Sequence, residues 1–417
     1  MKSYIIEGGR KLEGEVNVSG SKNASLPIIA STILADGISR LYNVPNIQDT
    51  KITLEILKIL GCKVNKCNGK IEIDSKNINK TEIPQELMHQ MRSTVILAGA
   101  LLGKFKNVTF SYPGGCDIGA RPIDLHLKAF KKLGISVEEK SGFIECKCDK
   151  IIGTDINLDF PSVGATENIL LASVLAEGTT TISNAAMEPE IIDLVNCLNK
   201  MGAKIKGAGT NLITVNGVQK LNGIGYNIMP DRIEAGTLLC AGAITGGKIV
   251  LNKVNVEHLI PVIHKLVECD CIVETEKEKI LLQAPKKIKP IEIKTLPYPG
   301  FPTDLQQVFG AMLCIAKGSS IIVENIFENR YKYISELAKM GAKATIEGKT
   351  LVIKGVKKLY GANVVSTDLR GGAALVLAGL CAKGRTTVTN IEYILRGYEN
   401  LDEKLNKLGA KVKLIKN

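Results

Sequence analysis

The chain has 417 residues, of which 45% are hydrophobic and 23% charged, and its formal net charge is +12. This length exceeds what one hydrophobic core usually serves, so we expect two domains. No apolar run approaches the ~20 residues that a membrane-spanning helix needs, and the N-terminal MKSYIIEGGRK has no signal-peptide pattern. We therefore expect a cytoplasmic protein without membrane contact. Lysines are dispersed and aromatic residues scarce (4%), so the positive charge favours small anionic substrates over nucleic acid.

The eleven cysteines and four histidines do not form a metal-binding pattern. No CxxC pair occurs and the histidines have no ligand spacing, so we expect no metal site. The cysteines are scattered and odd in number, which is typical of reduced thiols in a cytosol. The sequence leaves the oligomeric state open.

In chain order, a short phrase that predicts the C-terminal end of a helix recurs at intervals of 67 to 73 residues. Glycine is the expected left-handed residue after a helix. It occurs in the copies LGCKV, LGISV, MGAKI, MGAKA and LGAKV, at Gly61, Gly134, Gly202, Gly341 and Gly409. In a weaker copy, ECDCI, Cys269 stands where the glycine is expected. Six units of about 70 residues therefore fill the chain.

Each unit also contains a helix that is apolar on nearly every side, such as TVILAGALLG, NILLASVLA or AALVLAGLCA. A helix without a polar face must be buried on all sides. A glycine turn, a β-rich stretch, an amphipathic helix and a hairpin follow these helices. The pattern predicts an α/β fold built from βαβαββ-like units, with helices inside and sheets outside.

The sixth unit ends after one strand, and the N-terminus supplies the missing half, because YIIEGGRKLEG (4–14) matches LVIKGVKKLYG (351–361). We therefore expect residues 1 to about 21 to pair with the C-terminal strands. Residues 22–229 would form the first domain, and residues 1–21 together with 230–417 the second. The chain would cross between them near Lys22 and Pro230, which favours a hinged cleft with ligands between the lobes.

Charged and capping residues stand at the start of the buried helices. They are Lys22, Arg92, Ser162, Asp231, Arg232, Asp304, Asp368 and Arg370. Helix N-termini carry free N–H donors and a positive dipole end, so they are natural anion sites. Thr303 and Thr367 are expected to act as N-caps. Lysine and arginine oppose the dipole at this end, which indicates compensation by a bound phosphate or carboxylate.

Cys116 lies in PGGCDIGARP (113–122), a segment predicted to be an irregular loop. Among the eleven cysteines only this one lies in a glycine-flanked loop with an arginine, Arg121, close in sequence. A thiol on an electropositive loop can have its reactivity tuned. From these residues alone, a chance surface cysteine is the competing explanation.

Eight motifs follow one another along the chain. They are GSKNASLP (20–27), PGGCDIGARPIDLH (113–126), PSVGATEN (161–168), PDRIEAGT (230–237), FPTDLQ (301–306), FENR (327–330), TDLRGGAALVLAG (367–379) and RGYE (396–399). Together they resemble the UDP-N-acetylglucosamine enolpyruvyl transferases, the family that performs the first committed step of bacterial peptidoglycan synthesis. The resemblance implies two inside-out α/β barrel domains, each of three βαβαββ units, which agrees with the repeats.

The resemblance implies phosphoenolpyruvate and UDP-N-acetylglucosamine as small-molecule substrates, and no cofactor. Lys22, Arg121 and Arg396 would bind the phosphate of phosphoenolpyruvate. Arg330 and Arg370 would bind its carboxylate, with Asn23 beside them, because guanidinium forks suit oxyanions. The residues implied for the UDP-sugar site are Arg92, Arg121, Pro122, Ile123, Asp124, Leu125, Ser162, Val163, Gly164, Asp304 and Ile326.

The implied catalytic residues are Cys116, Asp304, Lys22 and Arg396. Asp304 would take the proton of the sugar 3'-hydroxyl as it attacks the central carbon of the enol ether. Cys116 would protonate the methylene carbon, and it can also form a covalent phospholactoyl adduct. A cysteine at this position further implies alkylation by fosfomycin.

Two other functions are compatible with the implied fold. A 3-phosphoshikimate 1-carboxyvinyltransferase shares the implied fold, but its lysine motif continues GSKS and it lacks the PGGC loop. A non-catalytic UDP-sugar-binding protein would be expected to have lost Cys116, Asp304 or the arginines, which are all present. One departure concerns Phe160-Pro161, where some family members carry a lysine that contacts the nucleotide.

Overall fold

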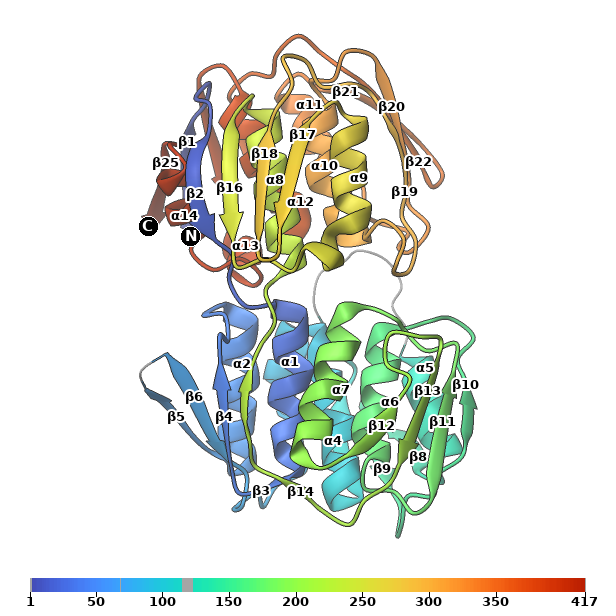
Figure 1. Ribbon diagram of the computed structural model, residues 1–417. Coiled ribbons are helices and arrows are strands. Elements are labelled where there is room, and N and C mark those ends of the chain that lie inside the picture. Colours follow the sequence, from blue (N-terminus) through green and yellow to red (C-terminus); the bar gives the residue numbers. More distant parts are fainter. Residues whose placement is uncertain (1, 68, 115–122, 417) are drawn as a thin grey trace. The chain divides into compact units, whose positions relative to one another are not determined.

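The computed structural model describes residues 2–67, 69–114 and 123–416 (Figure 1). The described residues form two compact units. One holds residues within 20–229 and is called the first unit; the other holds those up to residue 19 and from 230 onward and is called the second unit. In the part of the chain that the structure describes, no helix has the length and apolar character needed to cross a membrane.

The first unit contains inner helical segments that are almost wholly buried. They are α1 (Lys22–Ser31) with the 3-10 turn η1 (Thr32–Leu34), η2 (Arg92–Val95) with α4 (Ile96–Phe105), and α6 (Val163–Ser173). The outer helices are α2 (Gln48–Leu60), α3 (Gln85–Gln90), α5 (Asp124–Lys132) and α7 (Pro189–Met201). The strands are β3 (Ala35–Asp36), β4 (Ile38–Tyr42), β5 (Lys63–Cys67), β6 (Lys70–Asp74), β7 (Asn107–Ser111), β8 (Ser136–Lys140), β9 (Phe143–Lys147), β10 (Asp155–Asn157), β11 (Thr179–Ser183), β12 (Lys204–Lys206), β13 (Leu212–Asn216), β14 (Leu221–Asn222) and β15 (Gly225–Asn227).

The second unit repeats this plan. Its inner helices are α8 (Arg232–Ile244), η4 (Thr303–Leu305) with α10 (Gln306–Leu313), and α12 (Leu369–Cys381). Its other helices are η3 (Val256–Leu259), α9 (Ile260–Glu268), α11 (Tyr333–Lys339), α13 (Glu392–Leu395) and α14 (Leu401–Lys407). The strands are β1 (Lys2–Glu7), β2 (Glu13–Asn17), β16 (Lys248–Asn252), β17 (Ile272–Glu276), β18 (Lys279–Gln283), β19 (Glu292–Lys294), β20 (Ser319–Val323), β21 (Lys343–Glu347), β22 (Thr350–Lys354), β23 (Asn363–Val365), β24 (Arg385–Thr389) and β25 (Val412–Lys416).

The sheets share one topology. The strand that follows each inner helix lies between a parallel partner and an antiparallel hairpin, as in β15-β4-β6-β5, β10-β11-β13-β12 and β19-β20-β22-β21. In the sheet β7-β9-β8 the parallel partner is reduced to a bridge between Glu82 and Thr109. The repeat inferred from the recurring sequence phrase therefore has a counterpart in strand order.

The N-terminal strand completes a sheet at the other end of the sequence, as expected. Strand β1 lies between β24 and β25, with Ser3 opposite Thr389 and Tyr4 opposite Leu414. Figure 1 shows β1 beside β25. Strand β2 differs from the expectation, because it runs parallel to β16 and not beside a C-terminal strand. The N-terminal segment thus supplies strands to two sheets of the second unit.

The inner helices have no exposed face. In α12 every residue from Leu369 to Leu380 is buried, and α8, α10 and α12 contact one another. Burying a Leu or Ile side chain contributes about 1.5–3 kcal/mol, so these contacts are a main source of stability. Close approach depends on small residues: a Cβ on Gly310 of α10 would lie 2.2 Å from the Tyr333 hydroxyl oxygen.

The recurring glycines do end the amphipathic helices in the left-handed conformation. Their φ angles are 113° at Gly61, 81° at Gly134, 112° at Gly202, 91° at Gly341 and 94° at Gly409. The expectation for the weaker copy ECDCI, the fourth in chain order, is wrong by one residue. Asp270 takes the left-handed position with φ 67°, whereas Cys269 has φ −77° and is fully buried. Cys269 therefore replaces the buried Leu or Met that precedes the glycine in the other copies.

This assignment predicts opposite effects of glycine at the two neighbouring positions. Asp270→Gly should raise the free energy of unfolding by up to about 1 kcal/mol, because glycine adopts positive φ without steric cost. Cys269→Gly should lower it by roughly 2 kcal/mol, because it removes a buried side chain. Thermal and urea unfolding of both variants measure the difference. If Asp270→Gly destabilised the protein and Cys269→Gly did not, Cys269 would be the residue that corresponds to the recurring glycine.

Candidate active site

The inner helices begin with side-chain caps. Ser162 accepts a hydrogen bond from Ala165 N, at 3.3 Å, and Ser21 caps α1 in the same way. Asp231 accepts from two backbone N–H groups of α8, and Asp368 from Arg370 N and Gly371 N of α12. These caps bear out the expectation that capping side chains stand at these helix starts.

The expected capping roles of Thr303 and Thr367 are wrong. The Thr303 hydroxyl donates to Glu324 Oε2, at 2.9 Å, and makes no cap on η4. The Thr367 hydroxyl donates to Asp368 Oδ2, at 3.0 Å, while Asp368 itself caps α12. In both cases the hydroxyl donates a hydrogen bond to a carboxylate, so the threonine does not cap the helix N–H groups.

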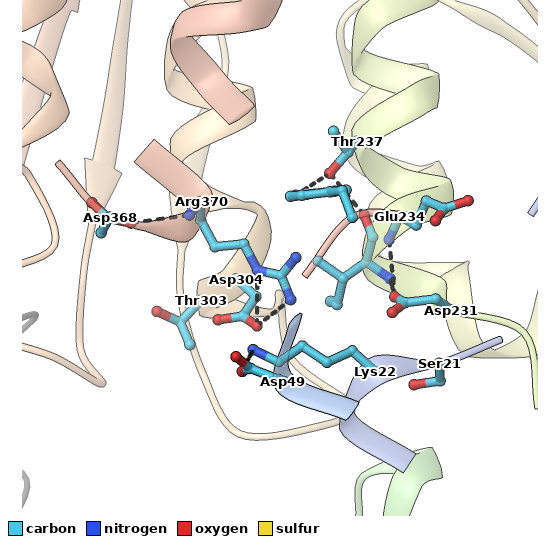
Figure 2. Close-up of polar contacts among 12 residues, drawn as sticks. Ser21, Lys22, Asp49, Asp231, Glu234, Thr237, Thr303, Asp304, Asp368 and Arg370 are labelled. Carbon is cyan, nitrogen blue, oxygen red and sulfur yellow. Dashed lines mark hydrogen bonds and ion pairs between the residues drawn. The ribbon is translucent and has the colours of Figure 1, made fainter. Parts of the chain in front are cut away.

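Lys22, the first residue of α1, is paired within the first unit. Its Nζ lies 2.9 Å from Asp49 Oδ2, and the Asp49 side chain is buried in the first turn of α2 (Figure 2). Asn23 follows Lys22 and is half-buried. The cation that opposes the dipole of α1 is therefore balanced by a protein carboxylate, a partner that the sequence did not indicate.

The residues expected to bind the UDP-sugar in the first unit gather at the starts of two helices. Asp124 begins α5, with Ile123 buried before it and Leu125 half-buried after it. Ser162, Val163 and Gly164 form the start of α6, which packs against α5.

His126 holds these helix starts together. Its Nδ1 lies 2.7 Å from Asn168 Nδ2, and a Cβ on Gly164 would lie 3.1 Å from its Cε1. Burial, with a smaller contribution from the charge of Arg92, lowers the pKa of His126 to about 4. The imidazole is therefore neutral near pH 7, and Arg92, the first residue of η2, lies close enough to act on it.

In the second unit, Asp304 forms ion pairs with two buried arginines, Arg330 and Arg370, and Figure 2 shows its contact with Arg370. Asp304 Oδ1 is 2.7 Å from Arg330 Nη2, and Oδ2 is 3.0 Å from Arg370 Nη2 and 3.2 Å from Arg370 Nε. The side chains of both arginines are only 5% exposed, whereas that of Asp304 is 23% exposed. The carboxylate therefore faces solvent while its two guanidinium partners are held below it in the protein.

Aromatic rings support both guanidinium groups. The Arg330 Cζ lies 4.9 Å from the centre of the Phe327 ring, and the Arg370 Cζ lies 5.1 Å from that of Tyr398. The Tyr398 hydroxyl also lies 2.9 Å from Thr237 Oγ1 of α8. Burial opposes the charge of Arg370, but its neighbours Tyr398, Asp304 and Asp231 raise its pKa overall. The guanidinium groups are thus fixed in orientation as well as in charge.

The remaining expected residues have simple placements. Ile326 lies in the loop after β20, Arg396 ends α13, and both are half-buried. Cys116, Arg121 and Pro122 lie outside the described residues. Phe160, at the position where some family members carry a lysine, is 42% exposed. The sequence did not single out Phe327, Tyr398 or Glu324, although the first two belong to the motifs FENR and RGYE.

The ten cysteines among the described residues are free thiols. Burial raises the pKa of Cys62 to about 11 and of Cys146, Cys197, Cys269 and Cys314 to about 12. These thiols are protonated at neutral pH and inaccessible, so they are poor nucleophiles. Cys67, at the end of β5, is exposed. Within residues 2–67, 69–114 and 123–416, no group of three or more His, Cys, Asp or Glu could hold a metal ion.

Comparison with known sequences and structures places this arrangement in a family context. The sequence model described as EPSP synthase (3-phosphoshikimate 1-carboxyvinyltransferase) matches residues 6–405. A UDP-N-acetylglucosamine 1-carboxyvinyltransferase 2 from Caldanaerobacter subterraneus subsp. tengcongensis is 52% identical and covers 99% of both chains. Similarly named proteins from Carboxydothermus hydrogenoformans and Geobacter metallireducens are 49% and 46% identical, each covering 100% of both chains.

Two solved structures are similar in fold. The enolpyruvyl transferase NikO from Streptomyces tendae matches with a TM-score of 0.90 at 24% identity, over 99% of this chain and 98% of that one. An EPSP synthase from Acinetobacter baumannii matches with a TM-score of 0.77 at 20% identity, over 100% of both chains. At these identities the likeness establishes a shared fold of mixed α/β content and nothing more.

Proposed function

We infer that this chain, which belongs to the family described as EPSP synthase (3-phosphoshikimate 1-carboxyvinyltransferase), transfers the enolpyruvyl group of phosphoenolpyruvate to the 3'-hydroxyl of UDP-N-acetylglucosamine, with release of phosphate. One observation carries the choice of acceptor. Full-length relatives at 46–52% identity are named UDP-N-acetylglucosamine 1-carboxyvinyltransferase. The shikimate reaction and a non-catalytic role are not favoured. We place this step of peptidoglycan synthesis in the cytoplasm, because both substrates are charged metabolites made there.

We further propose that each compact unit is an inside-out α/β barrel of three βαβαββ repeats. The recurrent strand order and the almost wholly buried helices α4, α8 and α12 support this proposal. In it, residues 22–229 form one domain and residues 1–21 with 230–417 the other. The chain leaves the second unit at Ser19, three residues before Lys22, which we propose to bind substrate.

We assign the binding of phosphoenolpyruvate to a set of cationic side chains and one asparagine. Lys22, Arg121 and Arg396 bind the phosphate, Arg330 and Arg370 bind the carboxylate, and Asn23 completes the set. Two observations support the arginine pair: both guanidinium groups are buried and oriented by rings, and Arg370 Nη1 has no hydrogen-bond acceptor among the described residues. A buried donor without an acceptor is costly, so a substrate oxygen there gains a full hydrogen bond.

The UDP-sugar is assigned to Arg92 and Arg121, to the segment from Pro122 to Leu125, to the segment Ser162–Gly164, and to Asp304 and Ile326. The packing of α5 on α6 through His126 supports this set, because it brings the segments 123–125 and 162–164 together. The first turn of α6 offers backbone N–H groups for a diphosphate oxygen. Since Phe160 replaces a lysine found in some relatives of this family, one cationic contact to the nucleotide is absent from our assignment.

The reaction needs a base that acts on the sugar hydroxyl and an acid that acts on the methylene carbon of phosphoenolpyruvate. Asp304 accepts the proton of the 3'-hydroxyl while that oxygen bonds to the central carbon of phosphoenolpyruvate. Each carboxylate oxygen of Asp304 contacts one guanidinium group, which fixes the orientation of the side chain for this step. Cys116 donates a proton to the methylene carbon, which becomes a methyl group. The tetrahedral intermediate then loses that proton again and expels phosphate, whose charge the cations Lys22 and Arg396 stabilise.

The proposed acceptor can be tested by phosphate release from phosphoenolpyruvate. UDP-N-acetylglucosamine should support turnover, and shikimate 3-phosphate should give less than about 1% of that rate, because a site built for one acceptor leaves polar groups unpaired with the other. UDP-glucose, which lacks the acetamido group, is a matched control for recognition of the sugar. Equal or faster turnover with shikimate 3-phosphate would overturn the assignment.

The role of Cys116 is tested by replacing it with the isosteric, much weaker acid serine. Cys116→Ser should abolish turnover and prevent covalent labelling by fosfomycin, while the affinity for UDP-N-acetylglucosamine, measured by calorimetry, changes less than threefold. Cys67→Ser, which removes the exposed thiol of β5, should leave rate and labelling unchanged. Intact mass spectrometry counts the adduct. Labelling that persists in Cys116→Ser, or a large loss of UDP-sugar binding, would contradict the role.

A further inference from the structure

Glu324 is a buried carboxylate to which neither the motifs nor the proposed mechanism assign a role. It follows β20 directly and is 1% exposed. Its Oε1 accepts hydrogen bonds from Thr295 Oγ1 at 2.8 Å, Ile326 N at 2.9 Å and Phe327 N at 3.3 Å. Its Oε2 accepts from Thr303 Oγ1 at 2.9 Å. The carboxylate therefore receives four donors from the second unit.

These donors come from three separate segments. Thr295 follows β19, Thr303 begins η4, and Ile326 with Phe327 lies in the loop after β20. Thr295 makes two further hydrogen bonds between these segments. Its Oγ1 accepts from Asn325 N at 2.9 Å, and its carbonyl oxygen accepts from Asn325 Nδ2 at 3.1 Å. One side chain thus fixes the mutual position of β19, η4 and the loop that follows β20.

Two charged residues of the candidate site, Asp304 and Arg330, lie on these segments. Asp304 is the next residue after Thr303, and Arg330 closes the loop after β20. Arg330 Nη1 donates to the Thr303 carbonyl oxygen at 3.3 Å, and Arg330 Nη2 lies 2.7 Å from Asp304 Oδ1. The Phe327 ring, whose own backbone N–H bonds Glu324, lies against the Arg330 guanidinium. Glu324 therefore bonds directly to Thr303, the neighbour of Asp304, and to Phe327, whose ring contacts Arg330.

We propose that Glu324 is a positioning residue for enolpyruvyl transfer: it holds Asp304 and Arg330 in the geometry that proton abstraction and substrate binding require, without touching a reacting atom. The inference rests on the proposed role of Asp304 as the base. Misplacing a catalytic group by about 1 Å can cost on the order of 100-fold in rate. A residue with a merely structural role would lower stability without lowering the turnover of the folded enzyme.

Substitutions can separate the bond between Glu324 and Thr303 from the bonds that Glu324 accepts from Thr295 and from the backbone of residues 326–327. In Glu324→Gln, the amide oxygen can still accept from Thr295 and the 326–327 backbone, and the amide nitrogen then faces the Thr303 hydroxyl. The change thus falls on the bond that positions Asp304. Thr303→Val removes the same bond from its other end, and Thr303→Ser retains the hydroxyl. Glu336→Gln is a matched control, because Glu336 is also a buried carboxylate of the second unit, bonded to Val365 N and Lys339.

Steady-state kinetics with both substrates, at a temperature well below the unfolding midpoint of each variant, tests the proposal. Glu324→Gln and Thr303→Val should each lower kcat by roughly 10- to 100-fold, with KM for UDP-N-acetylglucosamine changed less than threefold. The double variant should be no slower than the slower single variant, because both remove one interaction. Thr303→Ser and Glu336→Gln should remain within threefold of the unmodified protein.

Measurements on Asp304→Asn, with and without Glu324→Gln, test the positioning role of Glu324 separately from the proposed role of Asp304 as the base. Asp304→Asn alone should lower kcat at least 100-fold, and adding Glu324→Gln should then change the rate less than threefold. If Asp304→Asn keeps nearly full activity, the assigned base is wrong. If Asp304→Asn is inactive but Glu324→Gln and Thr303→Val stay within threefold, or lower only the unfolding temperature, the positioning role is overturned and the transferase assignment stands.

Discussion

The ion cluster in which Asp304 contacts both Arg330 and Arg370 is the interaction on which the chemistry of the second unit depends. Two guanidinium groups that are 5% exposed would be strongly unfavourable inside a protein without a nearby anion. Asp304 supplies that anion and remains the most exposed member. The same cations then suit an anionic substrate, because their charge, orientation and a remaining donor on Arg370 are already in place.

The fold explains how such charges come to lie at helix starts. Helices α8, α10 and α12 are buried on all sides, so their side chains cannot carry polar chemistry along their length. Their first turns carry free backbone N–H donors and charged side chains such as Arg232 and Arg370. Caps such as Asp231 and Asp368 satisfy some of these donors. The function is thereby confined to helix ends and to the loops that lead into them.

The sequence predicted what local physics determines. Apolar helices, left-handed glycines and the β1 pairing follow from periodicity and repetition, and they were correct apart from β2 and Cys269. It did not predict partners that only the tertiary structure brings together: Asp49 against Lys22, Tyr398 against Arg370, and Glu324 beneath Thr303. Thr303 and Thr367 show the limit clearly, since a hydroxyl that caps a helix and one that donates to a carboxylate look identical in sequence.

The most direct test of the account is a crystal structure with UDP-N-acetylglucosamine bound. We expect the 3'-hydroxyl oxygen about 2.6–3.2 Å from an Asp304 carboxylate oxygen, which is the reach a general base requires. Arg330 and Arg370 should remain against Asp304 from the protein side. A sugar whose 3'-hydroxyl faces another carboxylate, or solvent, with Asp304 serving only to neutralise the two arginines, would contradict the account.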